Sequence, residues 1–214
     1  MQIPRWVWLL AVFFLIRFFW MQHVREPITA VALADASTLR CETPPQFTSA
    51  DNPRQTANDN RMPPFRMGAA TVTPLAGFSM HGRVLSREDY AFGEEAKYSP
   101  TDLAMGWGPM EDFSIATALN ITQGGRWYHY SWGSEGPPLP ESVIIKSSAN
   151  MHMIPADISV ARALKSINAG DAVNINGWLV RIDQDNGWHW QSSLSREDSG
   201  GGACEVVYVC SISK

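Results

Sequence analysis

The chain has 214 residues, a formal net charge of −4 and a sequence pI near 5.7. Charged residues make up 18% of it, below the quarter or so that is usual in soluble proteins. The acidic balance argues against nucleic-acid binding, which ordinarily needs a basic surface. The length suits one domain with an additional segment.

That additional segment is an apolar run near the start of the chain. Residues 6–21 read WVWLLAVFFLIRFFWM, with Arg17 as the only charge. The run is slightly shorter than the roughly 20 residues of an average span, but an arginine near its end can extend towards the interface. Tryptophans near both ends suit the lipid–water boundary. We therefore predict a single transmembrane helix that enters the lipid bilayer through residues 6–21, within an N-terminal membrane anchor at residues 1–25.

Two other interpretations of this run are a cleaved signal peptide and a buried core helix. The small-residue cleavage candidates, at residues 32–36, lie well beyond the apolar run, whereas a cleavage site normally follows it closely. The arginines that follow the span mildly favour a cytoplasmic domain. N-terminal anchors of the bacterial kind commonly deliver the next domain outward, so we expect a single-pass protein of the cell inner membrane with a periplasmic domain.

The residues after the anchor divide into a linker and a folded domain. Residues 42–66 are rich in Pro, Asn, Asp, Thr and Gln and poor in aliphatic side chains, which is typical of flexible chain. We assign residues 26–69 to the linker and residues 70–214 to one globular domain.

The expected elements follow in chain order. Gly77 to Leu85 is typical of a strand, and Ser99-Pro100-Thr101-Asp102 predicts a helix start that ends at Gly106. Further strands are expected at 113–120, 126–132 and 142–147, a helix at 157–167, and strands at 173–182, 188–194 and 205–212. Gly124-Gly125 and Asp185-Asn186-Gly187 are hairpin turn signals.

The fold class is therefore mainly β with a minor α component. We expect an antiparallel β-sandwich or a small barrel of OB-like or SH3-like layout, with two short helices. The pentapeptide LSRED occurs at residues 85–89 and again at 194–198. Because the flanking residues differ, we interpret both copies as turns and not as a duplicated site.

The three cysteines leave the redox state open. Cys204 and Cys210 flank a predicted strand whose extended length, about 20 Å, exceeds the roughly 7 Å that a disulfide allows between Cα atoms, so we do not expect them to pair with each other. No CxxC or HxxxH spacing occurs, so we predict no metal site, and no cofactor is indicated.

One group of residues could carry catalysis. His152 lies between two methionines in a predicted loop and could act as a general base with Asp102 or Asp198, while Cys204 could serve as a nucleophile. No triad spacing can be identified locally, so the simpler interpretation is that Asn150 and His152 hold the loop in place.

A second group could carry binding. Alternation in the strand at 126–132 places Arg126, Tyr128, Tyr130 and Trp132 on one face. Such a face could stack on a sugar or a peptide, with Asn150 and His152 as further binding candidates, although aromatic strands are more often packed in a core.

The sequence favours a membrane-anchored, non-catalytic envelope domain that binds a partner protein or a glycan or assembles with itself. The alternative is a membrane-tethered hydrolase that uses His152 with an acidic partner. We expect no nucleic-acid partner.

Overall fold

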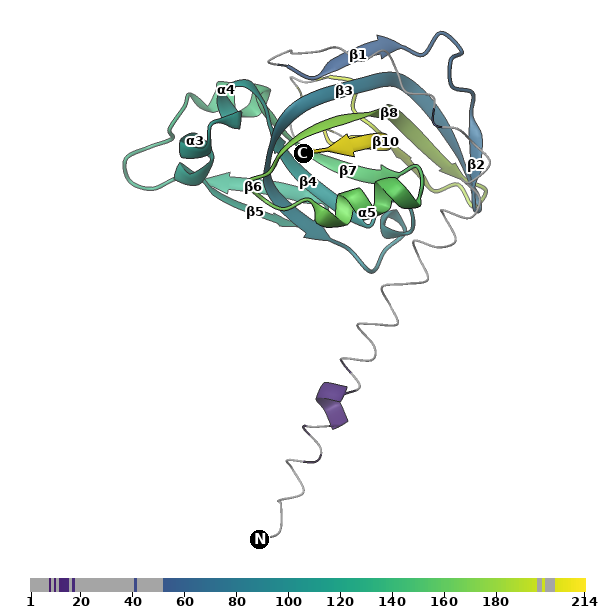
Figure 1. Ribbon diagram of the computed structural model, residues 1–214, viewed down its shortest axis with the longest axis horizontal. Helices are drawn as coiled ribbons and strands as arrows, with labels where there is room; N and C mark the ends of the chain where they lie inside the picture. The colour runs from purple at the N-terminus through teal and green to yellow at the C-terminus, as the bar shows by residue number, and fades with distance from the viewer. Residues whose placement is uncertain are drawn as a thin grey trace.

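The computed structural model describes residues 8, 10, 12–15, 17, 41, 52–195, 198 and 203–214. The prediction of a mainly β chain is confirmed (Figure 1). The strands are β1 (Arg54–Ala57), β2 (Phe65–Met67), β3 (Ala70–Asp89), β4 (Thr101–Gly106), β5 (Asn120–Gly124), β6 (Trp127–Ser131), β7 (Ser148–Pro155), β8 (Ala172–Gln184), β9 (His189–Gln191) and β10 (Glu205–Ser213). The helices are α3 (Phe113–Ala118), α4 (Glu141–Lys146) and α5 (Ile158–Ser166), with single 3-10 turns η1 (Glu95–Lys97) and η2 (Gly108–Glu111).

Five strands pair in a closed ring, in the order β3, β4, β7, β10, β8 and back to β3. The ring closes because β3 is 20 residues long and pairs with β8 along its first part and with β4 along its last. Figure 1 shows β3 curving around the other strands. The pair β7–β10 is parallel, so the prediction of a purely antiparallel sheet was wrong and the sheet is mixed. A parallel pair needs a long crossover, and here α5, β8 and β9 provide it.

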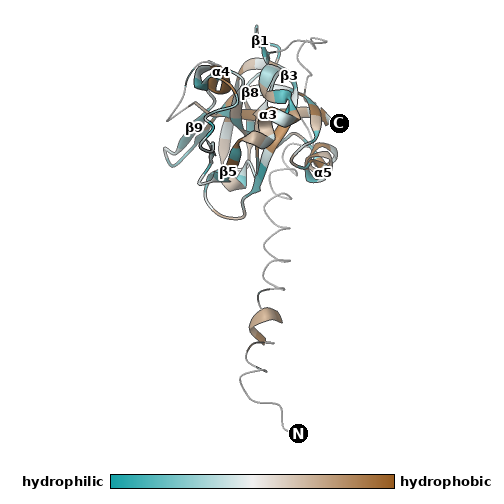
Figure 2. Ribbon diagram, turned by 90° about the vertical axis from the view of Figure 1, so that its left-hand side faces the viewer, coloured by the Kyte–Doolittle hydropathy of each residue, from teal (hydrophilic) through white to brown (hydrophobic). Residues whose placement is uncertain are grey.

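Alternation along each strand divides the apolar side chains between two cores. Every second residue of the ring points inward, as Leu103, Met105, Met151 and Met153 do, and these form one buried cluster. One face of α5 joins that cluster through Val160 and Leu164. In Figure 2, α5 lies on the opposite side of the strands from β9.

The second core lies on the outer face of β8 and β10, beneath β2 and the segment that precedes it. Met62, Phe65 and Met67 are buried there against Trp178 and Tyr208. Residues 54–67 were assigned to the linker from composition, but they contain two paired strands. Their few apolar side chains suffice because they add to a core that the ring has already formed.

The helix expected at residues 100–106 is instead strand β4. The Ser99 hydroxyl donates to the backbone oxygen of Thr101, 3.1 Å away, and does not cap a helix. Pairing with β3 on one side and β7 on the other outweighs the local cap signal.

Two expected strands are helices, because short apolar runs do not distinguish the two structures. At residues 113–118, α3 begins at Asp112, whose carboxylate accepts from the backbone nitrogen of Ser114. At residues 141–146, α4 follows Pro140. The loop expected at 148–155 is strand β7, and the first LSRED copy lies at the end of β3, paired with β4.

The strongest local signals were correct. Helix α5 is capped by Asp157, which accepts from the backbone nitrogens of Ser159 and Val160. Hairpin turns lie at Gly124-Gly125, between β5 and β6, and at residues 185–187, between β8 and β9.

No helix within the described part of the chain is long and apolar enough to cross a membrane. Most of the predicted span at residues 6–21 lies outside the described residues. A disulfide joins Cys41 to Cys210, with the Cα atoms 5.4 Å apart, while Cys204 is a free thiol. Cys204 and Cys210 are thus unpaired with each other, as strand geometry predicted.

Candidate functional site

A buried contact between a carboxylate and an imidazole joins two neighbouring strands of the ring. Asp102 on β4 stands directly opposite His152 on β7, so both side chains share the outer face of the sheet. His152 Nδ1 lies 2.9 Å from Asp102 Oδ1, without the alignment of a hydrogen bond. Residue exposure is 0% for Asp102 and 2% for His152. The sequence indicated Asp102 as one of two possible acidic partners of His152, and the register of two strands brings these two together.

Arg126 comes from the turn of the β5–β6 hairpin and completes the cluster. Its backbone has a φ of 71°, the left-handed region that a tight turn requires. Its Nη1 donates to Asp102 Oδ1 at 2.7 Å, and its guanidinium carbon lies 3.8 Å from the centre of the Tyr90 ring. Its backbone nitrogen donates to the Tyr90 hydroxyl at 3.1 Å. The hairpin tip is therefore held against β3 and β4.

Asn150, two residues before His152 on the same face of β7, links this cluster to its surroundings. Its side-chain nitrogen donates to Asp102 Oδ2 at 3.3 Å and to the backbone oxygen of Arg126 at 3.0 Å. Its side-chain oxygen accepts from Gln123 Nε2 at 2.7 Å. The contacts with Arg126 and Gln123 fix the hairpin relative to the ring, and the contact with Asp102 joins β7 to β4.

The Cys204 thiol, just before β10, lies at the edge of the same cluster. Its sulfur donates to the backbone oxygen of Arg126 at 3.8 Å. Burial raises the pKa of the thiol to about 12, and the negative charges of Glu205 and Asp102 add to the effect. The reactive thiolate is therefore scarce at neutral pH, which argues against Cys204 as a nucleophile.

The ion cluster is closed to a substrate. The Trp190 ring packs against His152, with ring centres 4.6 Å apart, and the Arg126 guanidinium lies 5.7 Å from the same tryptophan ring. Asp198, the other proposed acid, accepts from the Ser193 hydroxyl at 2.6 Å. The structure thus joins Asp102 to His152 and places Asp198 elsewhere.

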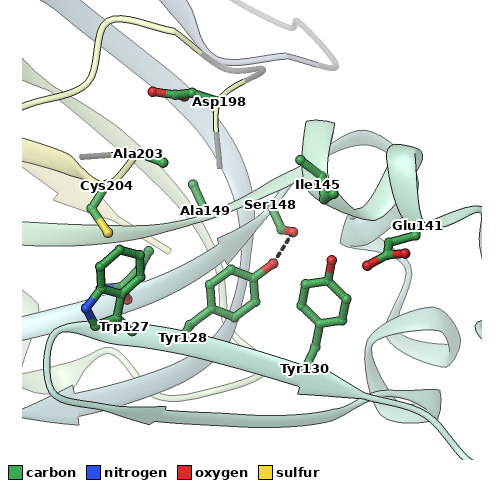
Figure 3. A pocket seen from close by; sticks show the side chains of 11 residues that line it. Trp127, Tyr128, Tyr130, Glu141, Ile145, Ser148, Ala149, Asp198, Ala203 and Cys204 are labelled. Atoms are coloured by element: carbon green, nitrogen blue, oxygen red, sulfur yellow. Dashed lines mark hydrogen bonds between the residues drawn. The ribbon is translucent and has the colours of Figure 1, made fainter. Parts of the chain in front are cut away.

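A pocket of about 330 Å³ opens beside the cluster, between the β5–β6 hairpin, α4 and the start of β7 (Figure 3). Its lining residues are Trp127, Tyr128, Tyr130, Glu141, Ile145, Ser148, Ala149, Asn150, Asp198, Ala203 and Cys204. Three of the proposed binding residues, Tyr128, Tyr130 and Asn150, line it. The other three, Arg126, Trp132 and His152, do not line it.

The aromatic face of β6 forms one wall of this pocket. Tyr128, Tyr130 and Trp132 follow one another, with ring centres 5.7 and 6.2 Å apart. Tyr130 and Trp132 also pack against a small core around Ile144. The Tyr128 hydroxyl lies 2.5 Å from the Ser148 hydroxyl, and burial raises the pKa of Tyr128 to about 12. On this face, Trp132 packs in the small core, Tyr128 lines the pocket, and Tyr130 does both.

The charged lining residues of the pocket are both acidic. Glu141, in the first turn of α4, points towards Tyr130 in Figure 3. Burial raises the pKa of Tyr130, and the Glu141 carboxylate raises it further. Asp198 lies on another side of the pocket. Among the described residues, no three His, Cys, Asp or Glu side chains converge as a metal site.

Sequence reasoning missed Glu141, Ser148 and Trp127 as lining residues. Alternation in 148–153 (Ser-Ala-Asn-Met-His-Met) could have identified strand β7. No local signal could have placed α4 beside the hairpin. Comparison with protein-family models, with curated proteins and with solved structures found no match to this chain.

Proposed function

We propose that this chain is a membrane-tethered, non-catalytic binding module whose ligand enters the pocket between the β5–β6 hairpin and β7. The single observation that carries the proposal is the division of the polar residues into two groups. The ion cluster is buried and covered by the Trp190 ring, whereas the adjoining pocket is open and combines aromatic walls with two carboxylates. Pockets that mix apolar walls with a few polar groups are the usual ligand sites of proteins.

The strand order supports an OB-type barrel. In that fold a five-stranded barrel carries its ligands on the face of its second and third strands. The corresponding strands here are β4 and β7, and Arg126 and Trp190 cover their outer face. A ligand of this chain would therefore contact the neighbouring pocket and not the covered face.

Binding is better supported than hydrolysis. The alternative function, a tethered hydrolase, rests on the contact between Asp102 and His152. Neither residue lines the pocket, and Cys204, which does, has a thiol pKa near 12. A general base must reach the proton that it removes, and the Trp190 ring covers His152.

The ligand classes that remain are a partner protein and a glycan. The pocket has no basic lining residue, and the chain carries a net charge of −4. A nucleic-acid phosphate would therefore be repelled.

The Cys41–Cys210 disulfide supports placement in an oxidising compartment. Together with the apolar run at residues 6–21, it favours an inner-membrane anchor in the lipid bilayer and a periplasmic domain.

Photo-crosslinking in intact cells tests the proposal. Trp127, 39% exposed at the pocket, is replaced by p-benzoylphenylalanine in the full chain. Ile158 on α5, 58% exposed and outside the pocket lining, provides the control position. We expect a discrete adduct at 127 that disappears when Ile145→Trp, on α4, fills the pocket, and none at 158. Equal adducts at both positions, or an adduct that survives Ile145→Trp, would contradict the proposal.

A further inference from the structure

We propose that the pocket receives a cationic side chain, the ammonium of a lysine or the guanidinium of an arginine, from a partner protein. This inference rests on the proposed function and narrows its ligand class. It is argued from charge, aromatic geometry, size and the exposed rim of the pocket.

Charge is the first argument. Two of the lining residues, Glu141 and Asp198, are acidic, and none is Lys, Arg or His. Within the described part of the chain, neither carboxylate forms an ion pair; the one hydrogen-bond partner of Asp198 is the neutral Ser193 hydroxyl. By contrast, the nearby Asp102 is neutralised by Arg126. An uncompensated negative lining favours a positive ligand.

The aromatic wall is the second argument. The Tyr128 and Tyr130 rings stand next to each other, and the Glu141 carboxylate points towards Tyr130 (Figure 3). A cation beside the face of an aromatic ring is attracted by its electron density, and a carboxylate next to the ring adds a direct ion pair. The rise in the pKa of Tyr130 has Glu141 as one cause, which agrees with a negative potential at this wall.

Size and surroundings are the third argument. A pocket of about 330 Å³ is at the lower end of ligand sites, which run from about 300 to 1,000 Å³, so it suits one side chain. Trp127 is 39% exposed at the pocket. Exposed tryptophan is characteristic of protein–protein contact surfaces, where it often dominates the binding energy. A partner protein could therefore insert a basic side chain and cover Trp127 at the same time.

The experiment uses the full chain in detergent micelles, labelled with 3-fluorotyrosine and followed by ¹⁹F NMR. The chain has 5 tyrosines, and Tyr128→Phe and Tyr130→Phe assign the two pocket signals. The probes are Nα-acetyl-lysine methylamide and Nα-acetyl-arginine methylamide. The uncharged control is Nα-acetyl-norleucine methylamide, and glucosamine and N-acetylglucosamine represent the sugar classes.

We expect saturable shifts of the two pocket signals with the lysine and arginine probes and none with the norleucine probe. Glu141→Gln should lower the affinity for the lysine probe roughly fivefold, which is the effect expected from losing a partly exposed ion pair. Asp185→Asn, which removes an exposed carboxylate that lies outside the pocket lining, should leave binding unchanged. Equal binding of lysine and norleucine, or no effect of Glu141→Gln, would overturn the inference.

The outcomes separate this inference from the proposed function. If N-acetylglucosamine shifts the pocket signals and the lysine probe does not, the cationic class is wrong while the binding module stands. If glucosamine binds as well as the lysine probe, the preference for a protein side chain is wrong. If no probe shifts the signals and the crosslink at 127 is also absent, both proposals fail.

Discussion

Replacing Asp102 with Asn tests whether the buried ion cluster holds the hairpin against the ring. The carboxylate lies 2.7 Å from Arg126 Nη1, 2.9 Å from His152 Nδ1 and 3.3 Å from Asn150 Nδ2, at 0% exposure. Asn preserves the shape and removes the charge, which leaves the Arg126 guanidinium, with a side chain only 15% exposed, without a counter-ion.

Breaking a buried ion pair by removing one partner typically costs about 3–5 kcal/mol. Because Asn keeps a side-chain oxygen as acceptor, we expect the lower end, about 3 kcal/mol. The assay is urea unfolding of the full chain in micelles, followed by tryptophan fluorescence. With a urea dependence of about 2 kcal/mol per molar, the midpoint should fall by about 1.5 M.

Asp185→Asn is the matched control, since it breaks an Asp–Arg pair of the same kind at the surface. Arg66 and Asp185 lie 3.2 Å apart with side chains 52% and 77% exposed, so solvent screens the pair and we expect little loss of stability.

The double variant Asp102→Asn with Arg126→Met completes the cycle. It should be less destabilised than the sum of the two single variants by about 1–3 kcal/mol, because the guanidinium no longer lies unpaired. If Asp102→Asn loses no more stability than the surface control, or if the cycle is additive, the reasoning is wrong.

Four further predictions concern three residues. Cys204 should react with iodoacetamide at pH 7.5 only after unfolding, because its thiol pKa is near 12; rapid labelling of the native chain would contradict this. Tyr208→Phe should raise the unfolding free energy by about 1 kcal/mol in thermal or urea unfolding, because the native hydroxyl is buried without a hydrogen-bond partner. The pKa of the same tyrosine is about 12 in the folded state and 10.0 in the unfolded state. The unfolding free energy should therefore be constant below pH 10 and fall as the pH rises from 10 to 12, by at most about 1.4 kcal/mol per pH unit. Tyr208→Phe should flatten this alkaline decline. Cys41→Ser should lower the unfolding free energy by about 2–5 kcal/mol, and a reducing agent should do the same to the wild type, while an unchanged midpoint would argue against the disulfide.

Elements with strong local signals could be predicted from the sequence. The Asp157 cap and the periodicity after it located α5, and the glycines at 124–125 and 187 located two hairpin turns. These features depend on interactions between residues close in the chain, so a short stretch contains the information.

Where a local signal competed with pairing between strands, the sequence was misleading. Ser99 and Pro100 predict a helix by themselves, yet Thr101–Gly106 is strand β4 because hydrogen bonding to β3 and β7 is available on both sides. The sequence indicated the aromatic alternation of the strand at 126–132. It did not indicate that the Arg126 side chain would bind Asp102 on β4.

By itself, the sequence determined a mainly β domain and an aromatic strand, and it indicated His152 with either Asp102 or Asp198 as an acidic partner. Only the tertiary structure decided that these two residues would meet. Asp102 and His152 belong to strands far apart in the chain, and the β4–β7 register sets them opposite each other. The same packing places the Trp190 ring over His152 and leaves Glu141 at the wall of the open pocket. The burial of a side chain depends on neighbours that no short stretch of sequence specifies.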